Sequence, residues 1–363
     1  MLLGALIMAS CDKEITVESA AKFNVTTEGT SFKAGTPIKF KLTGGEVQRI
    51  AFYSGEAKND YAFKDGRLAD VKGAGVTMTF TSSLTNGEQA TQLPGLGNQN
   101  NQLTILASTD FNGDYSSIAK VKAATWKDIT SRFVLGTSTS FVSSGIKDIA
   151  DLVVAGKPLY IAFKYVTKPQ ATNGIARIQG IQTFAVSSTA KLNNTIPLNF
   201  ALQNTAAFRI VDENPVNAPA RSSVSLTRVT LYGNQYFWPG HAIFDPANTV
   251  FDPLNPIYDP QSVYYVPTAV RPTYVAYSAS NPRNDPLSEN WAVSRAITIG
   301  DQIDLGPDLA KTVKTMNTAP LTEFIYTTGY VKPGTYKAVF VASNASKDDF
   351  QEITRGITLT ITP

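Results

Sequence analysis

The chain has 363 residues, a formal net charge of +3, 43% hydrophobic residues and 17% charged residues. At typical domain sizes this length predicts two or three domains, and the low charged fraction predicts a surface made polar by uncharged side chains. The positive charges form no long run, so nucleic acid is not an expected partner. Histidine and cysteine occur once each, as His241 and Cys11, which excludes an internal disulfide and a structural zinc site.

The start of the sequence is apolar. Met1 to Ser10 are almost wholly hydrophobic and end in small residues directly before Cys11. Such a stretch is typical of the hydrophobic region of a secretory signal peptide and is too short to span a bilayer as a helix. Residues 6–11 resemble the lipobox of bacterial lipoproteins, in which the cysteine thiol takes a diacylglycerol. The resemblance implies that residues 1–11 are a lipoprotein signal peptide with a lipidated Cys11.

The three residues that follow, Asp12, Lys13 and Glu14, are charged. They resemble the export signal that sends lipoproteins of the Bacteroidota to the outer face of the outer membrane. The resemblance implies a cell-surface protein anchored by acyl chains, without a membrane-spanning segment. The alternative is an unmodified, buried cysteine after a chance apolar start.

From Phe23 onward, short runs rich in Val, Ile, Thr, Phe and Tyr alternate with clusters of Gly, Pro, Asn and Asp. This pattern predicts an all-β fold. Period-two alternation predicts strands with one buried face at residues 38–42, 76–80 and 357–361. The best helical candidate is a turn or two from 146 to 154, followed by Gly156 and Pro158.

Both ends of the chain resemble parts of one kind of module. Residues 332–345, with a Pro-Gly turn before a Tyr-bearing strand, resemble the last strands of a PKD-type immunoglobulin-like sandwich. Residues 35–42 and 49–56 resemble its early strands. We therefore expect a discontinuous sandwich formed by residues 12–66 and 288–363, which requires only that the chain ends lie close together.

The region between them, residues 67–287, is expected to form an inserted domain. Residues 103–111, 124–129 and 156–165 occur in an order similar to the jelly-roll modules of cleaved adhesins. Together these segments resemble a family of Bacteroidota outer-membrane lipoproteins of unknown function, encoded beside SusC-like and SusD-like polysaccharide uptake proteins. Gly180 stands where related modules often carry a tryptophan.

Residues 232–287 form a loop region rich in aromatic residues and proline. Tyr232 to Tyr277 contain 11 aromatic residues and seven prolines, which predicts a projecting, irregular segment. Aromatic-Asp-Pro triplets recur every seven residues, centred on Asp245, Asp252 and Asp259. One interpretation is glycan binding, with sugar rings stacking on aromatic side chains and the three aspartates accepting hydroxyl hydrogen bonds or holding Ca²⁺. The stacking candidates are Tyr236, Trp238, Tyr258 and Tyr264.

A second interpretation of the triplets is structural: each is an Asx-type turn that sets an aromatic residue into a core. Asp110 to Asp114 similarly resemble the start of a calcium loop, but Tyr115 replaces the required glycine, so a turn between strands is expected. Trp126 and Trp291 are expected in a core. His241 has no titrating partner in sequence, so no base role is assigned to it.

The leading functional hypothesis is a non-catalytic surface lipoprotein that binds polysaccharide for a SusC/SusD-like uptake system. It needs no cofactor other than the Ca²⁺ considered above. One alternative is an adhesin-like or structural protein that contacts other proteins, marked by a flat apolar patch or an open strand edge. Another is a glycan hydrolase, which would need two carboxyl groups about 5–9 Å apart.

Overall fold

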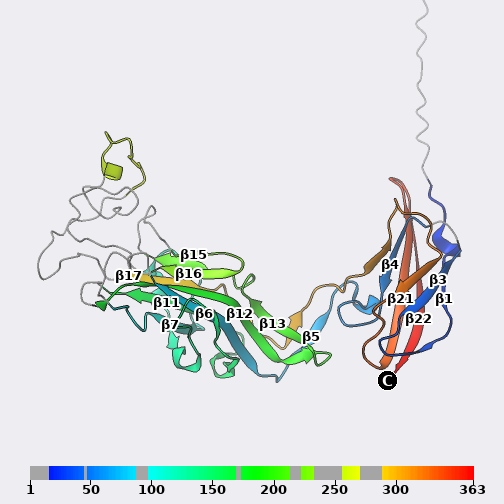
Figure 1. Cartoon of the computed structure of the whole chain (residues 1–363), viewed down its shortest axis with the longest axis horizontal. Coiled ribbons are helices and arrows are strands. Elements are labelled where there is room, and N and C mark those ends of the chain that lie inside the picture. The colour runs from blue at the N-terminus through cyan, green and yellow to red at the C-terminus, as the bar shows by residue number, and fades with distance from the viewer. Residues whose placement is uncertain are drawn as a thin grey trace, which may run out of the picture. The chain divides into compact units, whose positions relative to one another are not determined.

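The computed structural model describes residues 16–44, 47–86, 97–168, 173–212, 222–232, 256–269 and 288–363. Within these residues the chain is mostly β-strand, with one short α-helix (Figure 1). The expected all-β class is confirmed. None of the described helices is long and apolar enough to cross a lipid bilayer.

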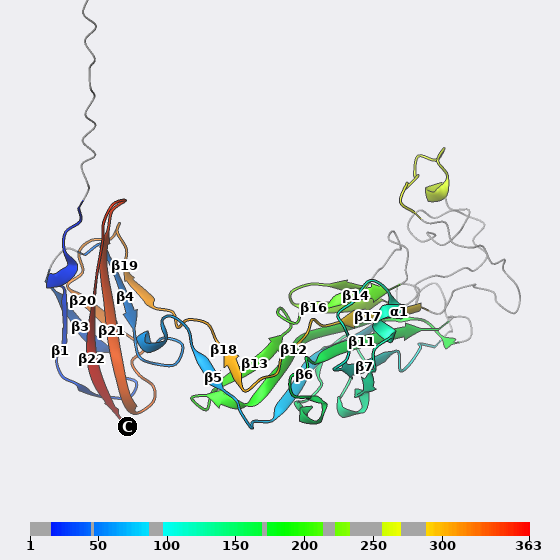
Figure 2. The same cartoon turned by 180° about the vertical axis from the view of Figure 1, so that it is seen from behind.

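The chain divides into two compact units (Figures 1 and 2). The first contains residues 1–69 and 304–363, and the second contains residues 70–303. The second unit is therefore inserted into the sequence of the first. The short strands β5 (Leu68–Asp70) and β18 (Gln302–Asp304) pair with each other, and the chain changes unit within each of them.

The first unit is a β-sandwich. One sheet has the strand order β1-β3-β20, and the other has the order β19-β4-β21-β22-β2. Strands β2 and β22 are parallel, whereas the other described pairs of this unit are antiparallel. The bounds are β1 Asn24–Thr27, β2 Ser31–Lys33, β3 Ile38–Thr43, β4 Arg49–Tyr53, β19 Lys311–Lys314, β20 Glu323–Tyr326, β21 Gly334–Ala345 and β22 Phe350–Thr362, with 3₁₀ turns at Ala20–Lys22 and Tyr61–Phe63.

Strands from both ends of the sequence form the core of this sandwich. The alternation in β3 buries Ile38, Phe40 and Leu42 and leaves the residues between them exposed. The ring of Phe40 lies 5.5 Å from that of Phe52 and 5.0 Å from that of Phe340, measured between centroids. Phe52 in β4 and Phe340 in β21 are register partners, so the early and late segments share both a sheet and a core.

The unit boundary differs from the expected break at residue 288. Strand β17 (Ser288–Val293) lies in the second unit, because it is hydrogen-bonded between β11 (Tyr160–Thr167) and β14 (Arg209–Asp212). Trp291, for example, is the register partner of both Lys164 and Val211. A strand with neighbours on both sides is part of their sheet, so the first unit resumes only at residue 304.

The second unit is also a β-sandwich. Its seven-stranded sheet has the order β10-β6-β12-β16-β15, with β13 also paired to β12 and β9 to β6, and its five-stranded sheet has the order β14-β17-β11-β7-β8. The remaining bounds are β6 Val76–Asn86, β7 Leu103–Ser108, β8 Lys127–Asp128, β9 Val142–Ser143, β10 Lys147–Asp148, β12 Arg177–Leu192, β13 Ile196–Leu202, β15 Ser223–Val224 and β16 Arg228–Tyr232.

The five-stranded sheet is buried on both faces. One face joins the seven-stranded sheet in a core that contains Phe80, Phe163, Phe184 and Phe208. The other face carries Trp291, which packs under α1 (Ile118–Lys122) and lies 5.5 Å from Trp126 between ring centroids. Burial on both faces explains the almost unbroken apolar run of β11.

The helix expected over residues 146–154 is wrong. This segment forms β10 and then a 3₁₀ turn at Ala150–Leu152, while Ile146 is exposed. Residues 147–148 pair with β6, and Ile149 is buried at the start of the 3₁₀ turn. The described α-helix lies at α1, where the hydroxyl of Ser117 accepts a hydrogen bond from the backbone N–H of Lys120.

Replacing Phe163 by alanine should lower the free energy of unfolding of the second unit by about 3–5 kcal/mol, because its fully buried ring contacts Phe80, Phe184 and Phe208. All three tryptophans lie in this unit, so tryptophan fluorescence during denaturant unfolding reports on it. Leu226→Ala is the control, since this exposed side chain should contribute less than about 0.5 kcal/mol. Equal stabilities of the two variants would contradict the core assignment.

Candidate functional site

The long connections of the second unit leave from one end of its sandwich, which we call the loop-bearing end. In both sheets, the strand ends that meet here are register partners or near neighbours. The pairs are Asn86 with Arg177, Ile178 with Tyr232, Tyr165 with Leu103, Thr167 with Ser288, and Asp212 with Asn290. Connections 87–102, 168–176, 213–222 and 233–287 therefore begin and end at this edge. The aromatic and proline-rich region of the sequence is one of these connections.

A pocket of about 450 Å³ opens between the two sheets at this end. We call it the loop-end pocket. Its walls come from the end of β6, the start of β12, residues 99–104 at the start of β7, and residues 128–137. Its volume lies within the range of small-molecule binding pockets. Residues that are distant in sequence meet here because both sheets end at the same edge.

Gln102 carries a buried polar atom without a hydrogen-bond partner in this pocket. Its side chain is 6% exposed, and its Oε1 lies 3.0 Å from the hydroxyl oxygen of Tyr165, while its Nε2 has no partner in the structure. The Tyr165 hydroxyl also lies 2.8 Å from the carbonyl oxygen of Arg177. Burial raises the pKa of Tyr165, so this group stays protonated. Rotating the amide of Gln102 would exchange its two atoms but would still leave one of them unpaired.

Arg177 contributes a second unpaired group. Its Nε is buried without a partner, and among the described residues its Nη2 contacts the carbonyl oxygens of Leu84 and Thr137, at 3.5 and 3.3 Å. No ion pair joins Arg177 to a carboxylate among the residues that the structure describes. Leaving a buried donor unpaired costs about 1–3 kcal/mol, so the Gln102 Nε2 and Arg177 Nε atoms are unfavourable for the stability of the fold.

Two other buried glutamines have a structural role. Gln99 donates to the carbonyl oxygens of Lys168 and Gly174, at 2.7 and 2.9 Å, and accepts from the N–H of Lys168. Gln179 donates to the carbonyl oxygen of Ser83 at 2.8 Å. These bonds hold the connections in place around the pocket. Gln99 and Gln179 thus use their amide N–H groups in hydrogen bonds within the protein, whereas the amide nitrogen of Gln102 has no such bond.

Asp128 is the one carboxylate among the residues that line the loop-end pocket. Its Oδ1 accepts a hydrogen bond from the N–H of Thr130 at 2.8 Å, and the residue is exposed. The lining therefore offers amide, guanidinium, hydroxyl and single-carboxylate groups. Such a set can form hydrogen bonds with the hydroxyl groups of a sugar.

Most residues expected to form a glycan site lie outside the described residues. These are Tyr236, Trp238, Asp245 and Asp252, and the expected lipidation residue Cys11 also lies outside them.

The third triplet is described, within residues 256–269. Tyr258 is 7% exposed and belongs to a small cluster with Ile257, Val266 and Ala269, whereas Tyr264 is 52% exposed. Oδ1 of Asp259 accepts from the N–H of Gln261, as in an Asx turn. This copy has the geometry of the structural interpretation, and Tyr264 is the stacking candidate that the described residues leave on the surface.

The described residues hold no cluster of three metal-ligating side chains. In the segment resembling a calcium loop, Asp110 accepts from the hydroxyl of Ser108 and the N–H of Thr125, at 2.7 and 2.9 Å. Asn112 accepts from the N–H of Asp114, and Asp114 from that of Ser116. These contacts are Asx-type turns, but the segment links β7 to α1 and does not join two strands as expected.

Gly180 lies on the outer face of β12 with no room for a larger residue. A Cβ there would approach the guanidinium of Arg228 to 2.7 Å, the hydroxyl of Ser83 to 2.8 Å and the ring of Phe141 to 3.1 Å. The guanidinium of Arg228 lies 5.3 Å from the centroid of the Phe141 ring. Arginine and phenylalanine thus fill the space that a tryptophan at position 180 would need.

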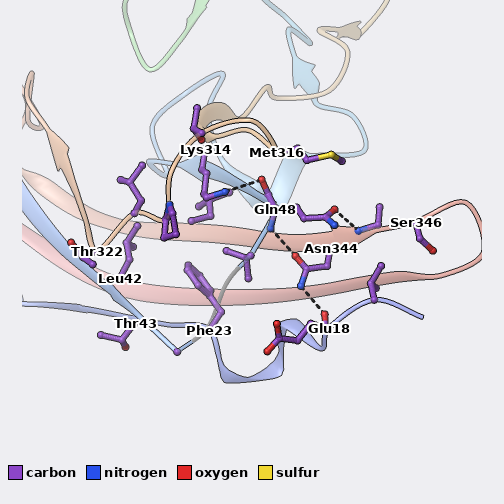
Figure 3. Close-up of a pocket in the computed structure, with 18 of the residues that line it drawn as sticks. Glu18, Phe23, Leu42, Thr43, Gln48, Lys314, Met316, Thr322, Asn344 and Ser346 are labelled. Carbon is purple, nitrogen blue, oxygen red and sulfur yellow. Dashed lines mark hydrogen bonds between the residues drawn. The ribbon is translucent and has the colours of Figure 1, made fainter. Parts of the chain in front are cut away.

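The first unit has a larger groove of about 770 Å³, which Figure 3 shows. Its polar wall is internally bonded: the N–H of Gln48 donates to Asn344, Asn344 donates to the carbonyl oxygen of Glu18, and Lys314 donates to the carbonyl oxygen of Gln48 (Figure 3). The described atoms that lack hydrogen-bond partners do not include any from this wall. The loop-end pocket is therefore the stronger candidate.

The fold and the pocket define an all-β protein with two sandwich units and a polar cavity at the loop-bearing end of one of them. Residues 10–208, more than half of the chain, match a domain of unknown function (DUF5017), and the chain belongs to this family. The matched range contains every residue that lines the loop-end pocket and stops before residues 232–287. Comparisons with curated proteins and with solved structures found no match.

The sequence contains one feature that points to the loop-end pocket, although the expected site residues do not include it. Residues 98–102 are five consecutive amide side chains directly before the buried strand β7. Asn and Gln side chains are usually exposed. Three or more consecutive ones next to a core strand therefore indicate either buried hydrogen bonds that stabilise the fold or a binding site. The structure contains both, in Gln99 and Gln102.

Two matched substitutions test this division of roles. Gln99→Leu should lower the free energy of unfolding by more than about 2 kcal/mol, because three hydrogen bonds are lost, whereas Gln102→Leu should change it by less than about 1 kcal/mol. Denaturant unfolding followed by tryptophan fluorescence measures both. A larger loss for Gln102→Leu than for Gln99→Leu would show that Gln102 is a structural residue.

Proposed function

We propose that this chain is a non-catalytic, lipid-anchored protein of the outer-membrane surface that binds polysaccharide and passes it to a SusC/SusD-like uptake system. The observation that carries the proposal is the loop-end pocket, in which Gln102 and Arg177 present buried polar atoms without partners. Sugars present many hydroxyl groups and few apolar ones, so a pocket that binds them needs free donors and acceptors held rigidly.

The position of the pocket adds support. The aromatic and proline-rich residues 233–287 leave β16 and return to β17 at the same end of the sandwich. Aromatic side chains there would give stacking surfaces beside the hydrogen-bonding groups of the pocket. The exposed Tyr264 belongs to this connection.

Binding without cleavage is favoured over hydrolysis by the pocket chemistry. Hydrolysis of a glycosidic bond normally uses two carboxyl groups on opposite sides of the bond. Asp128 is one carboxylate, and the described residues that line the pocket include no second one. The proposal therefore assigns no catalytic residue.

The expected result of a polysaccharide panel is binding without product. The full chain, purified in detergent, should be retarded in native gels that contain its ligand, and no new reducing ends should appear during incubation. Gln102→Leu should weaken retardation about tenfold, as expected for one buried hydrogen bond to a ligand, and Leu226→Ala should have no effect. Release of sugars, or retardation that is unchanged in Gln102→Leu, would contradict the proposal.

The anchor is tested by a single-atom change. Cys11→Ser replaces the only thiol of the chain by a hydroxyl, so no thioether-linked lipid can form. We expect the protein to move from the membrane fraction to the soluble fraction, since acyl chains supply the membrane affinity. Incorporation of radiolabelled palmitate by the wild type, but not by this variant, is the accompanying control. Unchanged membrane association of Cys11→Ser would remove the lipid anchor from the account.

A further inference from the structure

Arg177 differs from Arg67 and Arg132 in the partners of its guanidinium group. Arg67 forms two hydrogen bonds with Asp308, at 2.9 and 2.7 Å, and Arg132 forms two with Asp151, at 2.6 and 2.7 Å. Each of these guanidinium groups is thus neutralised by a carboxylate. Within the part of the chain that the structure describes, the guanidinium of Arg177 has two long contacts to carbonyl oxygens, and its Nε is buried without a partner.

The environment of Arg177 favours an anion. An unpaired charge that is partly removed from water is costly, and an anionic partner removes most of that cost. The carboxylate of Asp128 lines the same pocket but forms no ion pair with Arg177. The guanidinium thus lacks a carboxylate partner in the described part of the chain, and a carboxylate is the anion whose planar geometry matches a guanidinium group.

Gln102 provides the second contact point. It lies in the same pocket, and its unpaired amide atom is fixed because the opposite atom faces the Tyr165 hydroxyl. A sugar ring that carries a carboxylate also carries hydroxyl groups on adjacent carbons. A carboxylate on Arg177 and a hydroxyl on Gln102 would satisfy both unpaired groups with one ring.

We propose that the loop-end pocket selects acidic polysaccharides, with the carboxylate of a uronic acid residue paired to Arg177 and a ring hydroxyl bonded to Gln102. This inference rests on the proposed polysaccharide-binding function and narrows it to one class of ligand. Neutral glycans would leave the guanidinium unpaired and bind more weakly, because a charge-assisted hydrogen bond is about twice as strong as a neutral one.

The test compares ligands that differ only in charge. Polygalacturonate, alginate and hyaluronan are each offered to the full chain beside their methyl-esterified forms, in which the carboxylate is neutral. We expect at least one acidic polymer to bind about tenfold or more tightly than its ester, with an affinity that falls as NaCl is raised. Arg177→Gln should abolish this preference, whereas Arg177→Lys should keep part of it. Arg228→Gln is the matched control, since Arg228 also has an unpaired Nε but lies outside the pocket.

The outcomes separate this inference from the function on which it rests. Equal affinity for acid and ester, or a preference that survives in Arg177→Gln, overturns the acidic selectivity. If neutral polymers still retard the protein and Gln102→Leu reduces that retardation, the proposed polysaccharide binding is supported and the acidic selectivity is not. Absence of binding to every acidic and neutral polymer overturns both. Intact folding of each variant is checked by its tryptophan fluorescence spectrum, because Trp291 lies in the same sandwich.

Discussion

The unpaired polar atoms of Gln102 and Arg177 are the feature on which the functional account depends. A β-sandwich gains stability by burying apolar side chains between its sheets, and an unpaired buried donor opposes that gain. In this chain the neighbouring Gln99 and Gln179 line the same pocket and donate hydrogen bonds to backbone carbonyl oxygens. The proposed ligand site rests on this difference in hydrogen bonding between Gln102 and its two neighbours.

Topology places the loop-end pocket at the edge of the second unit where its long connections meet. Strands β6, β7, β11, β12, β16 and β17 all have their long connections at one edge of the second unit. A rigid sandwich therefore presents several segments from distant parts of the sequence at one place, which is a common arrangement for binding loops. Burial of the five-stranded sheet on both faces adds rigidity to the base of the pocket.

The sequence predicted the features that depend on local pattern. Period-two alternation located β3, β6 and β22, and the turn chemistry of Asp110 to Asp114 was visible from residue types. The helix expected near residue 149 failed because a short apolar run fits a strand edge as well as a helix face. The sequence pattern places residues 288–293 in the discontinuous sandwich, whereas β17 lies in the second unit, because its partners β11 and β14 are distant in sequence and local pattern does not show the pairing. The pocket was missed for the same reason: Arg177 and Gln102 meet only through sheet pairing.

An experimental structure of the full chain with a bound oligosaccharide of the tightest-binding polymer tests the account most directly. The account predicts a sugar ring in the loop-end pocket, with polar atoms of the ligand within hydrogen-bond distance of the Gln102 amide and the Arg177 guanidinium. A ligand bound elsewhere, with Gln102 and Arg177 satisfied by other side chains of the protein, would contradict it.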